Sequence, residues 1–240
     1  MSLVSFIIPA YNEERVLGRT LEALTRASRG LTERAEVIVV DDGSTDRTAE
    51  IARAHGARVV SVQHRKISAT RNAGAREARG QWLVFVDADT LVTECLIRST
   101  MTTLHSGAVG GGCAVRFDGR LPRYARALTA IFVPLYGALR LAAGCFLFCT
   151  RAAFEDVGGF DERLFAAEEV ALSVALRRRG RFVILREHVM TSARKLRTHS
   201  WREVLGTLLR LAVRGPRAMR EREALELWYG QRRADPESDS

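Results

Sequence analysis

The chain has few cysteines and no long apolar run. No stretch is long and apolar enough to predict a membrane-spanning helix. The short apolar run at 4–9 is followed at once by Tyr-Asn-Glu-Glu, which is not the pattern of a signal peptide. The cysteines form no Cys-x-x-Cys pair and no dense framework, so we expect reduced, mostly buried thiols in a cytoplasmic protein instead of disulfides or a zinc site; they are Cys95, Cys113, Cys145 and Cys149.

A largely disordered chain is excluded as well, because apolar residues are not scarce. They make up 47% of the 240 residues and charged residues 27%, which is ordinary for a globular protein. Residues 234–240 are the exception, since they contain no large apolar residue and are expected to form a disordered tail. The length fits one large α/β domain with an appended segment.

The formal net charge of +9 is concentrated in one segment. Residues 177–222 hold 14 Lys/Arg and three acids, a balance of +11, so the rest of the chain sums to −2. The fold as a whole does not require this basicity. Aromatic residues are few in the segment and no nucleic-acid-binding motif accompanies the charges, so nucleic acid is not the expected partner.

Hydrophobic patterns predict an α/β fold with a single doubly wound, mostly parallel sheet flanked by helices. Short runs rich in β-branched residues alternate with segments of helical spacing; the runs are 3–9, 35–40, 59–62 and 82–86. The second half is less regular, with strands expected at 108–117, 144–150 and 182–185 and a helix at 168–179. Residues 124–142 are largely apolar but are interrupted by Arg126, Pro134 and Arg140.

Acidic residues follow three of the predicted strands. They are Glu13 and Glu14 after the first, Asp41 and Asp42 after the second, and Asp87 and Asp89 after the run at 82–86. Open α/β sheets bind ligands at the carboxyl ends of their strands, where such side chains converge. Carboxylate oxygens suit Mg²⁺ or Mn²⁺, which would be shared with a diphosphate. The alternative for Asp87-Ala88-Asp89 is a solvated turn.

Four motifs in order carry a family resemblance. They are Ser5-Phe6-Ile7-Ile8-Pro9-Ala10-Tyr11-Asn12-Glu13-Glu14, Asp41-Asp42-Gly43-Ser44-Thr45-Asp46, Ala69-Thr70-Arg71-Asn72-Ala73-Gly74 and Asp87-Ala88-Asp89. With them the sequence resembles family-2 glycosyltransferases of the GT-A fold, from about Leu3 to Arg186. Gly158-Gly159-Phe160-Asp161-Glu162 and Glu168-Glu169-Val170-Ala171-Leu172 resemble that family's acceptor-side signature.

The resemblance implies a nucleotide-diphospho-sugar donor site. Tyr11 would lie against the base, beside the backbone of Pro9 and Glu13, and Asp41 would accept hydrogen bonds from base or ribose. Lys66 and Arg71 would meet ribose or phosphate, Asp87 would contact ribose or metal, and Asp89 would bind Mn²⁺ or Mg²⁺. The alternatives are a packed Tyr11, an Asp41 that caps a helix, and solvated basic side chains.

The resemblance also implies a catalytic base for an inverting transfer to a saccharide or lipid-linked acceptor. The family usually has Glu-Asp where this chain has Glu168-Glu169, so Glu169 falls at the position of the base. Glu168 is the alternative, and both acids also suit a helix N-terminus for electrostatic reasons alone. Two other functions stay open, a nucleotidyltransferase and a basic module that binds an anionic surface without catalysis.

We expect a catalytic domain at 1–196, with a nucleotide-sugar half at 1–106 and an acceptor half at 107–196, then a basic amphipathic extension at 197–233. Trp201, Leu205, Leu208, Leu209 and Ala212 form one helical stripe flanked by arginines. This pattern predicts docking on an anionic membrane surface, at the inner face of the cell membrane. The alternative is a helix packed on the catalytic domain. For His199 a surface role is favoured over a late metal ligand.

Overall fold

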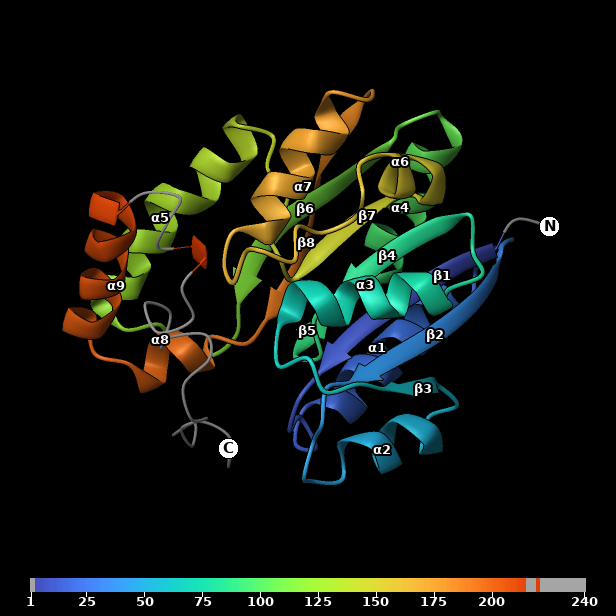
Figure 1. Cartoon of the computed structure of the whole chain (residues 1–240), viewed down its shortest axis with the longest axis horizontal. Helices are drawn as coiled ribbons and strands as arrows, with labels where there is room; N and C mark the ends of the chain where they lie inside the picture. The colour runs from blue at the N-terminus through green and yellow to red at the C-terminus, as the bar shows by residue number, and fades with distance from the viewer. Residues whose placement is uncertain (1–2, 215–218, 221–240) are drawn as a thin grey trace.

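The computed structural model describes residues 3–214 and 219–220, with the backbone alone for residues 208–214. The first half of the chain alternates strands and helices (Figure 1): β1 (Leu3–Ala10), α1 (Leu17–Ser28), β2 (Arg34–Asp41), α2 (Thr48–Ala54), β3 (Arg58–Ser61), α3 (Ile67–Glu77), β4 (Trp82–Val86), β5 (Thr90–Leu91) and α4 (Glu94–His105). The second half holds β6 (Gly110–Phe117), α5 (Arg123–Ala138), β7 (Phe146–Thr150), α6 (Arg151–Asp156), α7 (Glu168–Arg177), β8 (Phe182–Thr191), α8 (Arg194–Thr198) and α9 (Trp201–Arg214).

One eight-stranded sheet runs through the molecule in the order β3-β2-β1-β4-β7-β6-β8-β5. β1 pairs in parallel with β2 and β4, and β2 pairs in parallel with β3. β7 is antiparallel to both β4 and β6, and β8 is parallel to β6. The carboxyl ends of β1, β2, β4, β6 and β8 therefore share one edge of the sheet with the start of β7.

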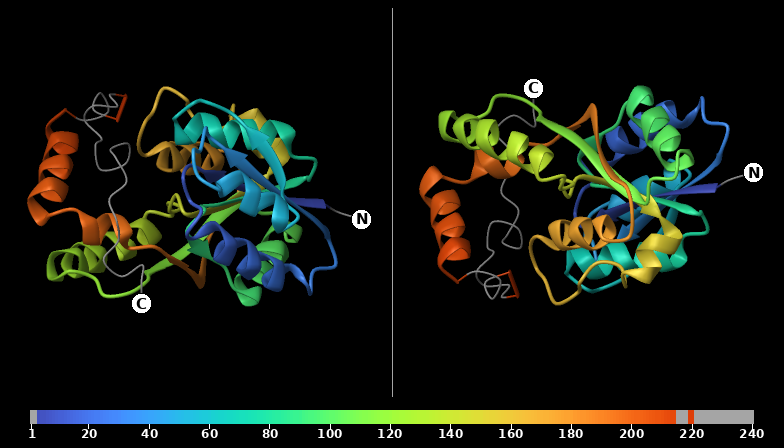
Figure 2. Two further views of the ribbon diagram at one scale, coloured as in Figure 1. Left: turned by 90° about the horizontal axis from the view of Figure 1, so that it is seen from below. Right: turned by 90° about the horizontal axis from the view of Figure 1, so that it is seen from above.

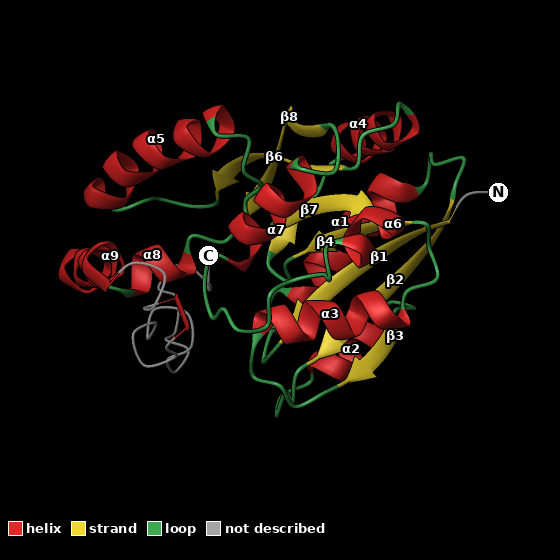
Figure 3. Ribbon diagram, turned by 45° about the horizontal axis from the view of Figure 1, so that its top comes forward, coloured by secondary structure: helices red, strands yellow, loops and turns green. Residues whose placement is uncertain are grey.

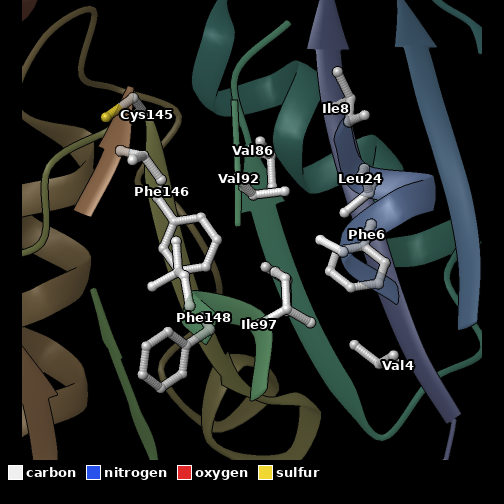
Figure 4. Close-up of a cluster of buried hydrophobic side chains, with 14 of the residues drawn as sticks. Val4, Phe6, Ile8, Leu24, Val86, Val92, Ile97, Cys145, Phe146 and Phe148 are labelled. Atoms are coloured by element: carbon white, nitrogen blue, oxygen red, sulfur yellow. The ribbon is translucent and has the colours of Figure 1, made fainter. Parts of the chain in front are cut away.

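Helices cover both faces of this sheet (Figure 3). Because successive side chains of a strand point to opposite faces, Phe6 and Ile8 pack with α1 and α4, whereas Ile7 packs with α3 and α7. Figure 4 shows the first of these two cores. Phe146 and Phe148 of β7 belong to the same core as the labelled side chains of β1 and as Ile97 of α4. Burial on both faces explains why these strands appear in the sequence as continuous apolar runs.

The predicted fold class is confirmed, with differences in the second half. β8 continues to Thr191, beyond the expected end at 185, because its last residues pair with both β6 and β5. The segment expected to be interrupted forms the helix α5, with Pro134 inside it. Among the described residues, no helix combines the length and apolar character needed to cross a bilayer.

Gly74 determines how closely α3 lies on the sheet. A Cβ at this position would be 2.4 Å from Cγ2 of Ile7 and 2.7 Å from Cγ2 of Val40, both buried β-branched side chains. Glycine therefore allows an approach that any larger residue would prevent. Arg71 is on the same helix one turn earlier, so its position over the sheet depends on this contact.

We predict that Gly74→Ala lowers the free energy of unfolding by about 1–3 kcal/mol, because the added methyl group overpacks a core that cannot yield. Gly137→Ala in α5 is the matched control, since a Cβ there would have no atom within 4 Å. This change should stabilise the protein by about 0.5–1 kcal/mol through helix propensity. Urea denaturation of both variants measures the difference; equal effects would contradict the packing argument.

Candidate active site

The side chain of Arg71 lies at the centre of the shared sheet edge, and the residue is only 1% exposed. Its Nη1 donates to Oε1 of Glu168 at 2.9 Å. Its Nη2 donates to Oδ1 of Asp87 at 2.8 Å and to the carbonyl oxygen of Gly144 at 2.7 Å. One guanidinium thus joins α3, the end of β4, the segment before β7 and the start of α7.

Arg71 stays charged in this environment. Burial alone would lower its pKa, but the carboxylates of Asp87 and Glu168 outweigh burial and raise it. The guanidinium carbon also lies 5.3 Å from the centre of the Phe160 ring. The sequence suggested a cation that meets ribose or phosphate, whereas the structure gives its guanidinium three protein oxygens as partners and almost no contact with solvent. The difference arises because Glu168 is 97 residues away in sequence.

Asp87 and Asp89 leave the end of β4 next to Glu13, which follows β1. Burial and, after it, the nearby carboxylates of Glu13 and Asp87 together raise the pKa of Asp89 to about 6, while Lys195 and Arg194 oppose the shift. Thr191 Oγ1 donates to Oδ1 of Asp89 at 3.4 Å. These side chains hold Asp89 in a crowded, negatively charged environment.

The oxygen donors at this edge fit a divalent cation. Asp87 and Asp89 supply two carboxylates of the kind that Mg²⁺ and Mn²⁺ prefer, and a cation there would relieve the repulsion that, besides burial, raises the pKa of Asp89. Within the described residues, no group of three or more His, Cys, Asp or Glu side chains could hold a metal ion. A cation held by these two carboxylates would take its remaining ligands from other groups or from water.

Glu168 and Glu169 open α7, after Ala167 in a left-handed conformation with φ of 60°. Burial and the neighbouring carboxylate of Glu168 raise the pKa of Glu169 to about 8, although Arg71 opposes the shift. A Cβ on Gly144 would lie 3.5 Å from the carboxyl carbon of Glu169, so the segment before β7 borders this side chain. Glu169 is thus a partly buried carboxyl group with strong proton affinity, close to Arg71 and Asp87.

Tyr136 belongs to the same region and was not predicted. Burial is the main cause that raises the pKa of the Tyr136 hydroxyl to about 12, and the carboxylates of Glu169 and Glu168 add to it. Because these two charges act on Tyr136, α5 lies in the neighbourhood of the two acids. No sequence pattern identified this residue, because it lies within the apolar segment at 124–142.

The predicted nucleotide-binding residues gather at the ends of β1, β2 and β3. The guanidinium carbon of Arg65 lies 3.8 Å from the centre of the Tyr11 ring, and Nζ of Lys66 lies 3.7 Å from the centre of the Phe165 ring. Asp41 is buried and accepts a hydrogen bond from the Ser44 amide. Pro9 is buried within β1, one residue from its end.

Two further residues organise this region. Asp42 accepts hydrogen bonds from the amides of His64, Arg65 and Lys66 at 2.6 to 3.2 Å, so its carboxylate holds the loop that carries two cations. Its position at a strand end was the only sequence signal for it. Arg194 at the start of α8 forms an ion pair with Glu13 at 3.2 Å. No pattern in the sequence indicated that contact.

His199 lies at the end of α8, where its Nδ1 is 2.9 Å from the carbonyl oxygen of Lys195.

The three cysteines Cys113, Cys145 and Cys149 are buried, and Cys95 is exposed. This distribution agrees with the expectation of mostly buried thiols.

A mostly parallel sheet flanked by helices, with carboxylates gathered at one sheet edge, resembles the architecture of GT-A type glycosyltransferase domains. The chain belongs to glycosyl transferase family 2, whose sequence model matches residues 5–158. The structure resembles the mannosyltransferase PcManGT from Pyrobaculum calidifontis in complex with GDP-Man and Mn²⁺, with a TM-score of 0.69 and 20% sequence identity over 88% of this chain and 64% of that one.

Curated relatives are similar over part of their length. Validoxylamine A glucosyltransferase of Streptomyces hygroscopicus is 34% identical over 131 residues, which are 50% of this chain and 30% of that protein. Glucosyl-3-phosphoglycerate synthase of Mycolicibacterium paratuberculosis is 31% identical over 170 residues, 60% of this chain and 49% of that protein. The chain therefore spans less than half the length of either relative.

We predict that Arg71→Met lowers the free energy of unfolding by about 3–5 kcal/mol, because the change leaves two carboxylates without their buried partner. The matched control is Arg76→Met on the same helix, whose side chain is 64% exposed. Its effect should stay within about 0.5 kcal/mol. Denaturation at pH 7 compares the two variants, and a cost below about 1 kcal/mol for Arg71→Met would refute a central role for this ion pair.

Proposed function

We propose that this chain is a metal-dependent, inverting glycosyltransferase that moves a sugar from a nucleotide-diphosphate donor to an acceptor hydroxyl or phosphate. The observation that carries the proposal is the double ion pair of Arg71. It fixes Asp87, one of the two carboxylates suited to a metal, and Glu168, the neighbour of the carboxyl group suited to a base, against one buried cation. Membership in family 2 supports the same conclusion.

The donor would lie along the carboxyl ends of β1, β2 and β4. Tyr11 would stack on the base, Asp41 would accept hydrogen bonds from base or ribose, and Lys66 would meet the phosphates. The Mn²⁺ complex of the mannosyltransferase neighbour supports a divalent cation at Asp89 and Asp87. When bound, such a cation neutralises the charge that develops on the leaving diphosphate. Arg71 would not contact the donor itself but would hold Asp87 in position, so it is a positioning residue.

Glu169 would accept the proton of the acceptor hydroxyl as the acceptor oxygen attacks the anomeric carbon from the face opposite the diphosphate. A base is most effective when its pKa lies near the working pH, and the raised pKa of Glu169, about 8, meets that condition. The carboxylate of Glu168 is paired with Arg71, which makes it the weaker candidate. Glu168 would instead hold the start of α7 in place.

A panel of radiolabelled nucleotide sugars tests the proposal directly. The protein with Mn²⁺ should release sugar slowly from a preferred UDP- or GDP-sugar even without an acceptor. It should also be stabilised against heat by that donor, by about 2.7 kcal/mol at 100 times the Kd. Pyrophosphate exchange would point to a nucleotidyltransferase, and neither reaction nor binding would point to a module without catalysis.

We predict that Asp89→Ala abolishes the metal-dependent part of UDP or GDP binding, because one carboxylate cannot replace two in holding the cation. Isothermal titration with and without Mn²⁺ measures that part. Asp46→Ala is a suitable control. It also removes an acid, but this acid accepts a hydrogen bond from the Thr48 amide at the start of α2 and is not a proposed metal ligand. Unchanged Mn²⁺ dependence in Asp89→Ala would exclude this residue as a ligand.

We predict that Glu169→Gln lowers turnover by about 10²–10⁴-fold while donor affinity survives, because the amide keeps the size but cannot accept the proton. Glu168→Gln should cost less. In the unchanged protein kcat/KM should rise with pH up to about 8, since the carboxyl group of Glu169 is protonated and inactive below its pKa. A larger loss for Glu168→Gln, or a flat pH profile, would assign the base elsewhere.

A further inference from the structure

The helix α5 carries large apolar side chains on its outer face. Ile131 and Leu135 are 65% and 44% exposed, and with Leu139 they fall at i, i+4 and i+8, which is one stripe along the helix. Phe132 beside them is also exposed. Contiguous exposed apolar patches of this kind are uncommon on proteins that stay free in water, and they mark surfaces that bind something.

The helix α9 adds a second exposed stripe. Trp201 and Leu205 are 52% and 51% exposed, whereas Val204 and Thr207 on the other side of the helix are buried. The apolar stripe recognised in the sequence therefore begins on the solvent side and not against the catalytic domain. Its later members, Leu208, Leu209 and Ala212, have side chains outside the described part of the chain.

The two helices lie at the same end of the molecule in all three views of Figures 1 and 2. Tyr124 of α5 connects them, because its hydroxyl donates to the carbonyl oxygen of His199, two residues before α9, at 2.8 Å, and is also bonded to that of Leu196. We call this end the α5–α9 surface and define it by Ile131, Phe132, Leu135, Leu139, Trp201 and Leu205.

The rim of the α5–α9 surface is basic. The sequence has no acidic residue at 119–154 or at 188–202. Exposed arginines lie at both ends of α5 and at the start of α9; they are Arg123, Arg126, Arg140 and Arg202. The acids that border these two stretches in the sequence are engaged, because Asp118 forms an ion pair with Arg197 and Glu203 accepts a hydrogen bond from the Ser200 amide.

We propose that the α5–α9 surface docks on an anionic lipid bilayer. Apolar side chains flanked by arginines fit the boundary between acyl chains and anionic headgroups. A second copy of the chain is a poorer occupant, because a twofold contact would bring like charges together. Nucleic acid would satisfy the arginines but leave the aliphatic stripe without a counterpart, since bases stack on aromatic rings.

The surface adjoins the proposed catalytic base. Tyr136 of α5 lies near Glu169 and Glu168, whose carboxylates add to burial in raising its pKa. The segment that follows α5 reaches Gly144, which accepts a hydrogen bond from Arg71 and borders the side chain of Glu169. A docked molecule would therefore hold its acceptor side at the membrane, where a lipid-linked saccharide or lipid phosphate is available. This last step rests on the proposed function, but the docking itself does not.

Vesicle co-sedimentation of the full chain tests the docking. We expect binding to vesicles of phosphatidylcholine with phosphatidylglycerol, loss of that binding at high salt, and little binding to phosphatidylcholine alone. Arg126→Gln/Arg140→Gln should lower the partition coefficient about thirtyfold, and Ile131→Ser/Leu135→Ser about tenfold or more. Arg29→Gln/Arg53→Gln removes the same charge from exposed positions just after α1 and on α2, and it should change the partition coefficient less than threefold, about the size of experimental scatter.

Three results would overturn the docking proposal. One is no binding to anionic vesicles, and another is an equal loss in the Arg29→Gln/Arg53→Gln control, which would mean attraction by net charge alone. The third is light scattering that shows a dimer dissociated by Ile131→Ser/Leu135→Ser. Titration of the same variants with UDP or GDP and Mn²⁺ separates the two proposals, because nucleotide binding should persist in all of them whether or not they bind vesicles.

Discussion

The arrangement of the site depends on one buried charge, the guanidinium of Arg71. An unpaired cation in such a place would cost several kcal/mol, so the fold must supply its partners from elsewhere in the chain. Asp87, Glu168 and the carbonyl oxygen of Gly144 do so. As a consequence α3, the end of β4, the segment before β7 and the start of α7 cannot shift independently. The distance between the two pairs of acids is set before any substrate arrives, which is how a site lowers the entropic cost of reaction.

Negative charge is in excess around this cation. Among the described residues around Asp87 and Asp89, five carboxyl groups lie near three cations; the acids are Glu13, Asp87, Asp89, Glu168 and Glu169, and the cations are Arg71, Arg194 and Lys195. Burial, together with this excess, raises the pKa of Asp89 to about 6 and that of Glu169 to about 8. Such crowding disfavours the folded state and is typical of sites that bind cations or exchange protons. Under the proposed function, the same burial and repulsion that cost stability would favour the binding of a divalent ion and give the base its raised pKa.

The sequence predicts the strands that surround this site better than the ion pairs at its centre. Strands β1, β2 and β4 appear as apolar runs because both of their faces are buried, and parallel pairing then brings their terminal acids to one edge. The partner of Arg71 could not be found this way, because no local pattern relates it to an acid 97 residues later. The helix α5 was not predicted for a different reason. Pro134 normally ends or kinks a helix, yet here it lies within one, at an exposed position where a missing hydrogen bond is least costly.

The helix α5 relates the outer surface of the molecule to its chemistry. If its only role were to border the site, its outward positions would be polar, as they are on most surface helices. Instead the stripe that includes Ile131 and Leu135 faces outward, while Tyr136 on the same rigid element lies near the proposed base. Under the proposed docking, a bilayer that covers the stripe would lie on the side of the site where the acceptor is proposed to bind. We therefore infer that this one helix would couple recognition of the surface to selection of the acceptor.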